Sequence, residues 1–254
     1  MTEEQQQMAP GLIQAFNPEE SEEPTDGRRR GRNQDDPIIN LRSWTPRTRL
    51  GNAVMAGQII TFEQALASNL PIREVEVVDA LIPNLEDEII KVNMGQRMTD
   101  SGRRVRFNVM ACVGNKDGYV GLGMAKAKEV SQAIRKAITA AKLNIISVQR
   151  GNGSWESSSG PGTSVPFKIN GRSASTRVTL MPAANGKGLV IGETGKKVLD
   201  LAGITDVLSR TKGQTRTTIN YAAATFNALK NLNTTRLSKV QREKLFINKG
   251  RMFE

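Results

Sequence analysis

Two alternating stretches separated by a turn constrain the middle of the chain. Apolar and polar residues alternate over 90–94 and again over 105–113, on either side of the turn sequence Asp100-Ser101-Gly102. Successive side chains of a strand point to opposite faces, so this pattern predicts a β-hairpin with one buried face. The turn sequence 114–118 then leads to a third short strand over 119–122. We therefore expect three antiparallel strands.

A helix is predicted directly after these strands, from about Ala125 to Lys142. Its apolar stripe falls within roughly 100° of arc on a helical wheel. That stripe consists of Val130, Ile134, Ala137, Ile138, Ala141 and Ile145. A second stripe, of Lys128, Arg135 and Lys142, is basic. One helix would thus carry a face for packing on the sheet and a face for an anionic partner.

The distribution of charge indicates what that partner is. The formal net charge is +11, and residues 1–27 contain seven acids and no Lys or Arg. With all 36 basic residues and 18 of the 25 acids, the remainder of the chain carries +18. Such an excess favours a polyanion such as nucleic acid. Aromatic residues are only 4% of the chain, too few for serial base stacking, which favours structured RNA over single strands.

Several classes of function are excluded by composition. The chain has no histidine, the commonest general base and metal ligand, and its single cysteine, Cys112, excludes a Cys-rich zinc site. We expect Cys112 to be a small buried apolar residue in a strand. No apolar run approaches the roughly 20 residues that span a bilayer, so no membrane partner is expected. We predict no enzyme activity, no metal and no cofactor.

A second folded unit follows a Gly- and Ser-rich stretch. Its expected elements are a strand around 176–180, a Gly-rich turn over 183–188, a short buried strand over 189–191, a helix over 196–202, a segment around 207–208 and a helix over 218–229. The predicted class is α+β, with a sheet-and-helix module followed by a small α/β domain.

The expected organisation divides the chain into six parts. They are a disordered acidic and Arg-rich tail (1–40), an extended segment wrapping another body (41–83), the sheet-and-helix module (84–150), a linker (151–165), the α/β domain (166–229) and a basic tail (230–254).

Two glycine-rich turns suggest nucleotide binding only superficially. Gly121-Leu122-Gly123 follows an antiparallel strand instead of opening a parallel βαβ unit, and we interpret it as a close backbone approach where only glycine fits. Gly192–Lys197 fails the P-loop pattern, because Val190 stands at the first glycine position and Lys197 follows Lys196. Free amides at a helix start flanked by these lysines would instead bind backbone phosphate.

The strongest candidate site is Gly123–Lys128, which would place two lysines at the start of a helix on a three-stranded sheet. Double-stranded-RNA-binding domains use this arrangement to read the shape of A-form RNA. The predicted phosphate contacts of the first module are Arg103, Arg104, Arg106, Lys116, Lys126, Lys128, Arg135 and Lys142. Those of the second domain are Lys187, Lys196, Lys197, Lys212 and Arg216.

Runs of residues across both units resemble the fifth small-subunit ribosomal protein family. They include Gly102–Phe107, Val113–Gly123, Ala125–Val130, Leu180–Ala183, Gly186–Val190, Ala202–Val207 and Ala224–Leu229, in the family's order. The segment from Trp44 through Asp79 resembles the archaeal and eukaryotic branch, and we favour the archaeal one. The resemblance implies a double-stranded-RNA-binding-like module, a C-terminal α/β domain with a left-handed crossover, and a place in the cytoplasmic ribosome.

The resemblance also implies specific partners. They are small-subunit ribosomal RNA, the fourth small-subunit protein as a neighbour, and the nearby path of incoming messenger RNA, with a contribution to decoding accuracy. Asp100 in the hairpin turn departs from more basic bacterial relatives, which affects the contacts of that tip. Two alternatives remain at this stage: a free RNA chaperone or translational regulator using the same surfaces, and a phosphate-handling enzyme using the glycine-rich turns.

Overall fold

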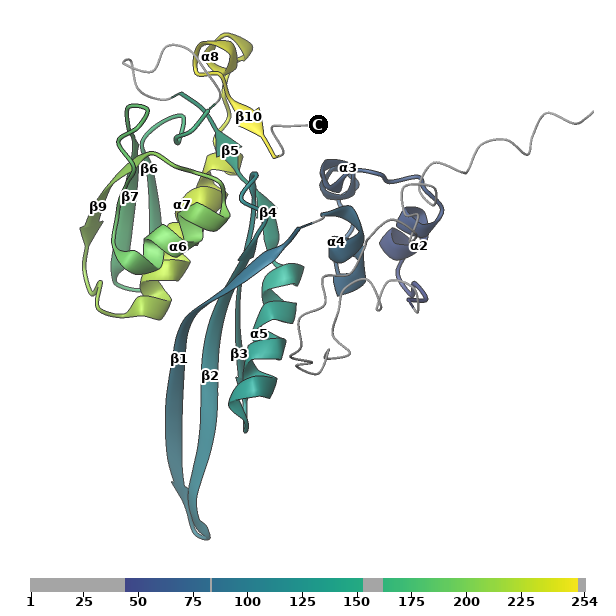
Figure 1. Cartoon of the computed structure of the whole chain (residues 1–254), viewed down its shortest axis with the longest axis vertical. Coiled ribbons are helices and arrows are strands. Elements are labelled where there is room, and N and C mark those ends of the chain that lie inside the picture. The colour runs from purple at the N-terminus through teal and green to yellow at the C-terminus, as the bar shows by residue number, and fades with distance from the viewer. Residues whose placement is uncertain (1–43, 83, 153–161, 251–254) are drawn as a thin grey trace, which may run out of the picture. The chain divides into compact units, whose positions relative to one another are not determined.

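The computed structural model describes residues 44–82, 84–152 and 162–250 (Figure 1). The tail expected over 1–40 and most of the linker expected over 151–165 lie outside the described residues. The α+β class is confirmed: a mixed sheet-and-helix module precedes a second α/β domain.

The segment expected to be extended contains three short helices. They are α2 (Arg49–Met55), α3 (Phe62–Ala67) and α4 (Val75–Leu81). Thr48 caps α2 by accepting a hydrogen bond from the Gly51 amide, and Thr61 forms a capping box at α3. Helices this short are stable in water only when they are packed, and the short amphipathic stretch at Phe62, Ala65 and Leu66 was too brief to predict a helix from the sequence.

These helices pack on the rest of the same chain, so the interpretation of 41–83 as an extension around another body is wrong for its described residues, 44–82. Phe62 and Val78 share a hydrophobic cluster with Tyr119, and the rings of Phe62 and Tyr119 meet edge-to-face with centroids 5.2 Å apart. The Lys142 Nζ atom lies 2.7 Å from Asp79 Oδ1, which joins α4 to the long helix α5 (Val130–Leu143).

The central sheet has four antiparallel strands, one more than expected. They are β1 (Glu86–Thr99), β2 (Gly102–Gly114), β3 (Tyr119–Ala127) and β4 (Ile145–Ser147), in the order β1-β2-β3-β4. The predicted hairpin and its turn are confirmed. Its distal half is not buried on either face, however, because β1 and β2 continue past α5 (Val130–Leu143) (Figure 1). Met94 and Met98 there are 66% and 71% exposed.

The boundary between β3 and the helix differs from the prediction. β3 extends to Ala127, and α5 begins only at Val130. The long partner strand explains the difference, because Met110, Val109 and Asn108 of β2 pair with Met124, Ala125 and Lys126. Alanine and lysine favour helices intrinsically, but the ladder of hydrogen bonds offered by β2 overrides that preference.

Helix α5 packs closely on two glycines of β3. A Cβ on Gly121 would overlap the Ala141 carbonyl oxygen, and one on Gly123 would overlap the Ala137 oxygen and the Ala141 amide nitrogen. Ala133, Ala137 and Ala141 form the buried face of the helix, while Val130 is 36% exposed. The interpretation of Gly121-Leu122-Gly123 as a close backbone approach is therefore confirmed.

The second domain pairs a four-stranded sheet with two helices. The strands are β6 (Ile169–Ser173), β7 (Thr176–Pro182), β8 (Leu189–Val190) and β9 (Val207–Lys212), in the order β6-β7-β9-β8. The helices are α6 (Glu193–Leu201) and α7 (Thr218–Thr234). β8 and β9 run parallel and are connected through α6. Strand β6 was not predicted, and β8 is not buried, since Val190 is 48% exposed.

The C-terminal segment is more ordered than a tail. After α7, Ser238 caps α8 (Lys239–Lys244) with a capping box, and β10 (Asn248–Lys249) pairs with β5 (Gln149–Arg150). The expectation of an unstructured segment over 230–254 is wrong up to Gly250, the last described residue.

One hydrophobic cluster connects the two sheets. Cys112 and Leu122 of the central sheet lie in the same buried cluster as Val178 of β7 and Leu199 of α6. Arg150, only 4% exposed, joins the domains as well: its Nη2 atom donates to Asp117 Oδ1 at 2.6 Å, and its Nη1 atom donates to the Gly203 carbonyl at 3.4 Å. Arg150 is therefore a structural cation.

Candidate nucleic-acid interface

The hairpin and β3 carry basic side chains on one face. Arg97 lies opposite Arg104, Gly95 opposite Arg106, and Asn108 opposite Lys126. Directly opposed residues in antiparallel strands share a face, and so do residues two apart along a strand. Val109, the neighbour of Asn108, points to the other face and packs under α5. We call Arg97, Arg104, Arg106 and Lys126 the hairpin basic face.

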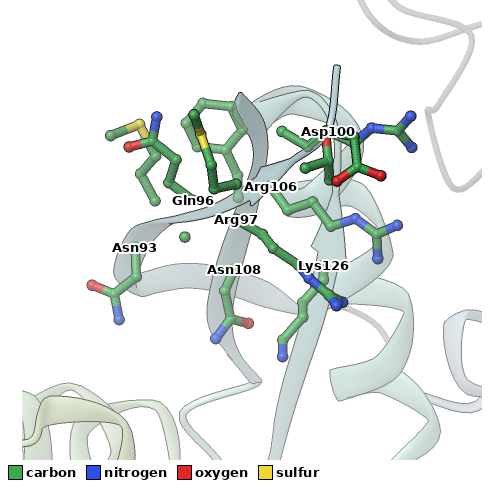
Figure 2. Close-up of a pocket in the computed structure, with 13 residues that line it drawn as sticks. Asn93, Gln96, Arg97, Asp100, Arg106, Asn108 and Lys126 are labelled. Atoms are coloured by element: carbon green, nitrogen blue, oxygen red, sulfur yellow. The ribbon is translucent and has the colours of Figure 1, made fainter. Parts of the chain in front are cut away.

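These four side chains surround a pocket of about 740 Å³. Figure 2 shows Arg97, Arg106 and Lys126 reaching into it from three neighbouring strands. Gly95 supplies no side chain, which leaves room at the centre of the face. Among the residues lining the pocket, Asp100 at the hairpin turn is the one acid. The pocket is therefore strongly electropositive.

Electrostatics of this face favour an anion from outside the chain. Arg97 and Arg104 stand directly opposite each other, and like charges in that position destabilise a sheet. Both are exposed, so water screens the repulsion without removing it. Asn108 adds a polar group at the base of the pocket: its Oδ1 atom is buried and has no hydrogen-bond partner within the described part of the chain.

The lysines predicted at a helix start occupy other positions. Lys126 lies in β3, and Lys128 is exposed in the bend before α5. Arg135 is exposed on α5 itself. Arg103 pairs with Met98, so it lies on the opposite face of the hairpin from Arg104. The prediction of two lysines in the first helical turn is therefore wrong, although the structure does bring Lys126 close to the arginines of β2.

Three predicted contacts are engaged in ion pairs within the chain. Lys142 binds Asp79, and the two side chains are only 18% and 10% exposed. Lys197 Nζ lies 2.7 Å from Glu88 Oε1. Lys116 Nζ lies 2.6 Å from Glu86 Oε2, and the hydrogen bond that Lys116 donates to this carboxylate raises the pKa of Lys116.

Of these three lysines, Lys142 is the one whose charge is not available to RNA. Its charge is buried against Asp79, while the pairs of Lys116 and Lys197 remain substantially exposed. An exposed pair contributes little stability and can exchange partners when a phosphate approaches.

The remaining predicted cations of the second domain, Lys187, Lys196, Lys212 and Arg216, do not converge with one another. Lys187 lies in the turn before β8, which pairs with the start of β9, whereas Lys212 ends β9 and Arg216 follows it. The six residues of β9 therefore separate Lys187 from Lys212 and Arg216 by about 17 Å. Lys196 is exposed on α6, but Glu193 in the first turn of that helix opposes anion binding.

Neither a metal nor a membrane site is found in this part of the chain. Over residues 44–82, 84–152 and 162–250, no cluster of three or more Cys, Asp or Glu side chains could hold a metal ion. Within the same ranges, no helix is long and apolar enough to cross a bilayer. Cys112 is fully buried, and desolvation raises the pKa of its thiol to about 12.

Comparison with known proteins identifies the family. Residues 85–149 match the model of the ribosomal protein S5 N-terminal domain, and residues 171–244 match that of the ribosomal protein S5 C-terminal domain. The chain is 54% identical over 198 residues to the small ribosomal subunit protein uS5 of Methanospirillum hungatei, covering 78% of this chain and 97% of that protein. It belongs to the ribosomal protein S5 family.

Other relatives agree with this assignment. The chain is 52% identical over 214 residues to uS5 of Methanocaldococcus jannaschii, covering 84% of this chain and 99% of that protein. It is 53% identical over 193 residues to uS5 of Methanothrix thermoacetophila, covering 76% and 95%. The predicted resemblance to the fifth small-subunit family, in its archaeal branch, is confirmed. The S5 family is a family of structural proteins and not of enzymes.

Sequence reasoning missed two members of the site in this S5-family chain. Arg97 lies between the alternating stretch 90–94 and the turn, and only its register opposite Arg104 shows that it belongs to the basic face. Asn108 looked like a polar spacer between Phe107 and Val109, yet its amide lies at the base of the pocket. The alternation of 105–113 already placed Arg104, Arg106 and Asn108 on one face, which was the available signal.

Proposed function

We propose that this chain is a structural constituent of the small ribosomal subunit and binds ribosomal RNA through its hairpin basic face. The observation that carries the proposal is the register of the central sheet. It gathers four cations from three strands onto one exposed face, with one acid at the rim of the pocket. Family membership supports assembly into the subunit, and the geometry supports phosphate as the group that is bound.

The chemistry of the pocket suits folded RNA. Guanidinium groups form paired hydrogen bonds with phosphate oxygens, and Arg97, Arg104 and Arg106 provide three of them on adjacent strands. Binding of this kind recognises backbone shape more than base sequence.

The finer expectations belong to the same proposal. They are a position beside the decoding region and the path of incoming messenger RNA, contact with the fourth small-subunit protein, and a contribution to decoding accuracy. The exposed distal half of the hairpin supports a role in reaching RNA away from the body of the protein (Figure 1). Of the predicted contacts, Lys128, Arg135, Lys187, Lys196 and Arg216 remain peripheral candidates, because they are exposed but lie outside the pocket.

A salt titration tests the hairpin basic face. The variant Arg106→Gln/Lys126→Gln should bind duplex RNA of unrelated sequences more weakly, and the slope of log K against log salt should become shallower by about 1–2 units, since each lost phosphate contact removes somewhat under one. The matched control is Lys239→Gln/Lys244→Gln on α8, which removes two exposed charges elsewhere. Equal slopes for the two variants would show that the hairpin cations are only solvated.

A second measurement separates a subunit constituent from a free RNA chaperone. After centrifugation through high salt, a constituent remains with the small subunit in a one-to-one ratio. A free regulator is washed off. Loss of the wild-type chain from subunits under conditions that retain other subunit proteins would favour the regulator.

A further inference from the structure

The sheet of the second domain has one covered and one open face. Val178 and Leu180 of β7 are fully buried in the cluster that contains the side chains of α6 and α7. The alternate residues Arg177 and Thr179 therefore project from the other side of the sheet. No described helix contributes a buried cluster on that side.

Basic residues gather on this open face in two adjacent rows. Arg172, Arg177 and Lys212 are directly opposed across β6, β7 and β9. The next row holds Thr179 opposite Arg210. All four cations are exposed. We call Arg172, Arg177, Arg210 and Lys212 the sheet basic face.

Three of these cations line a pocket of about 410 Å³. Its other lining residues are Asn170, Gly171, Thr179 and Asn231, so the lining contains no acid. In the described part of the chain, neither Arg177 nor Lys212 forms an ion pair. The pocket thus presents positive charge together with amide and hydroxyl groups.

Side chains from α7 make the edge of this pocket rigid. Asn231 Nδ2 donates to the Asn170 carbonyl oxygen at 2.9 Å, and Asn227 Nδ2 donates to the Arg172 carbonyl oxygen at 3.0 Å. Those carbonyls belong to the edge strand β6, which would otherwise present them to solvent or to another strand. Arg172 Nε also donates to the Ala174 carbonyl oxygen at 2.9 Å. The guanidinium is therefore held in place before any ligand arrives.

The sheet basic face carries an electrostatic cost that an anion would relieve. Arg177 lies between two other positive charges: Arg172 is directly opposite it on β6, and Lys212 is directly opposite it on β9. Each such pair is destabilising by itself. A phosphate group between them turns repulsion into two or three charge-assisted hydrogen bonds.

We propose that the sheet basic face is a second RNA-backbone site, in which a phosphodiester group lies between Arg172, Arg177 and Lys212. The proposal rests on the RNA binding proposed above, but it concerns residues of a different sheet. An acidic protein segment is the other anionic partner with similar charge. The pocket favours RNA because its lining contains no large apolar or aromatic residue, and the centres of protein–protein interfaces are rich in those.

Full-length variants compared on one RNA test this second site. The probe is a transcript of small-subunit ribosomal RNA, and the variant is Arg177→Gln/Lys212→Gln. Its salt slope should be shallower than that of the wild type by about 1–2 units, in addition to the effect of Arg106→Gln/Lys126→Gln. The control Lys239→Gln/Lys244→Gln should leave the slope close to the wild-type value.

The melting temperature in low salt distinguishes residues that bind RNA from residues that support the fold. Because the two side chains repel each other, Arg177→Gln/Lys212→Gln should melt at the same temperature as the wild type or higher. A lower melting temperature together with a wild-type salt slope would mean that the two residues support the fold, and it would overturn the proposal.

The outcomes also separate the two RNA sites. We call Arg177→Gln/Lys212→Gln the sheet variant, Arg106→Gln/Lys126→Gln the hairpin variant and Lys239→Gln/Lys244→Gln the α8 control. If the salt slope of the sheet variant matches that of the α8 control while the hairpin variant has a shallower slope, the second site is refuted and the hairpin site stands. If neither variant differs from the control, both proposals fail. If the sheet variant keeps its RNA slope but loses binding to a polyglutamate peptide, the face is a protein docking surface, and the RNA proposal is overturned.

Discussion

Replacing Gly123 with alanine should destabilise the protein because α5 lies directly on this residue. The added Cβ would overlap the Ala137 carbonyl oxygen and the Ala141 amide nitrogen. Both are backbone atoms of a helix, so neither can move aside by changing a side-chain rotamer. The helix itself has to withdraw from the sheet.

The size of the effect follows from that displacement. Ordinary Cβ contacts begin near 3.4 Å, so the helix must retreat by about 1 Å. A gap of that size removes roughly a quarter to a half of the dispersion energy of each contact it opens. The contacts at risk are those of Ala133, Ala137 and Ala141, each 0% exposed. Overpacking in cores costs about 1–3 kcal/mol, and a clash with backbone places Gly123→Ala near 3 kcal/mol.

Urea unfolding with a matched control measures this cost. Gly95 lies in β1 of the same sheet, and a Cβ there would meet nothing closer than the Arg106 carbonyl oxygen at 3.7 Å. Gly95→Ala should therefore change the free energy of unfolding by no more than about 0.5 kcal/mol. Gly123→Ala should lower the midpoint without changing the slope m. A cost below about 1 kcal/mol, or one equal to that of Gly95→Ala, would refute the close contact between helix and strand.

Two further predictions concern buried groups. Lys142→Met should lower stability by about 2–3 kcal/mol in thermal unfolding, because it leaves the nearly buried Asp79 carboxylate unpaired. The same variant should leave the salt slope of RNA binding unchanged. A shallower slope would mean that Lys142 contacts RNA. Because burial raises the pKa of Cys112 from 9.0 to about 12, stability should be lost as the pH rises above 9, where the unfolded thiol ionises and the folded one does not. Thiol labelling at pH 8 should accordingly proceed no faster than unfolding, and rapid labelling of the native protein would contradict the burial.

Local patterns were sufficient for several elements of the fold. The alternation on either side of Asp100-Ser101-Gly102 predicted the hairpin and its turn, because a strand with period two is hard to mistake when a turn sequence interrupts it. Gly121 and Gly123 indicated a close approach, since a glycine pair in a strand has few other uses. The family resemblance supplied the biological setting.

Other elements depended on partners far along the chain. The end of β3 at Ala127 was missed because the strand continues only as long as β2 offers hydrogen bonds to it. Helices α2, α3 and α4 were missed because six or seven residues carry too little periodicity. Their stability comes from packing: α3 and α4 share a cluster with Tyr119 and Ile145, and Leu50 of α2 is buried against α3 and α4. Strand β6 was missed because its polar residues face outward and its Gly171 lies under α7.

The sequence by itself determined that this is a basic α+β protein of the S5 family with a hairpin rich in arginine. Tertiary structure alone decided which cations are available to RNA. Lys142 looked equivalent to Lys126 in the sequence, yet the packing of α4 places Asp79 against Lys142, while strand register places Lys126 beside Arg106 and Asn108. The physical reason is that the neighbours of a charge in space decide whether it is neutralised. Lys142 meets the carboxylate of Asp79, which is 63 positions away in the sequence, whereas the strands beside Lys126 offer it an arginine and an amide.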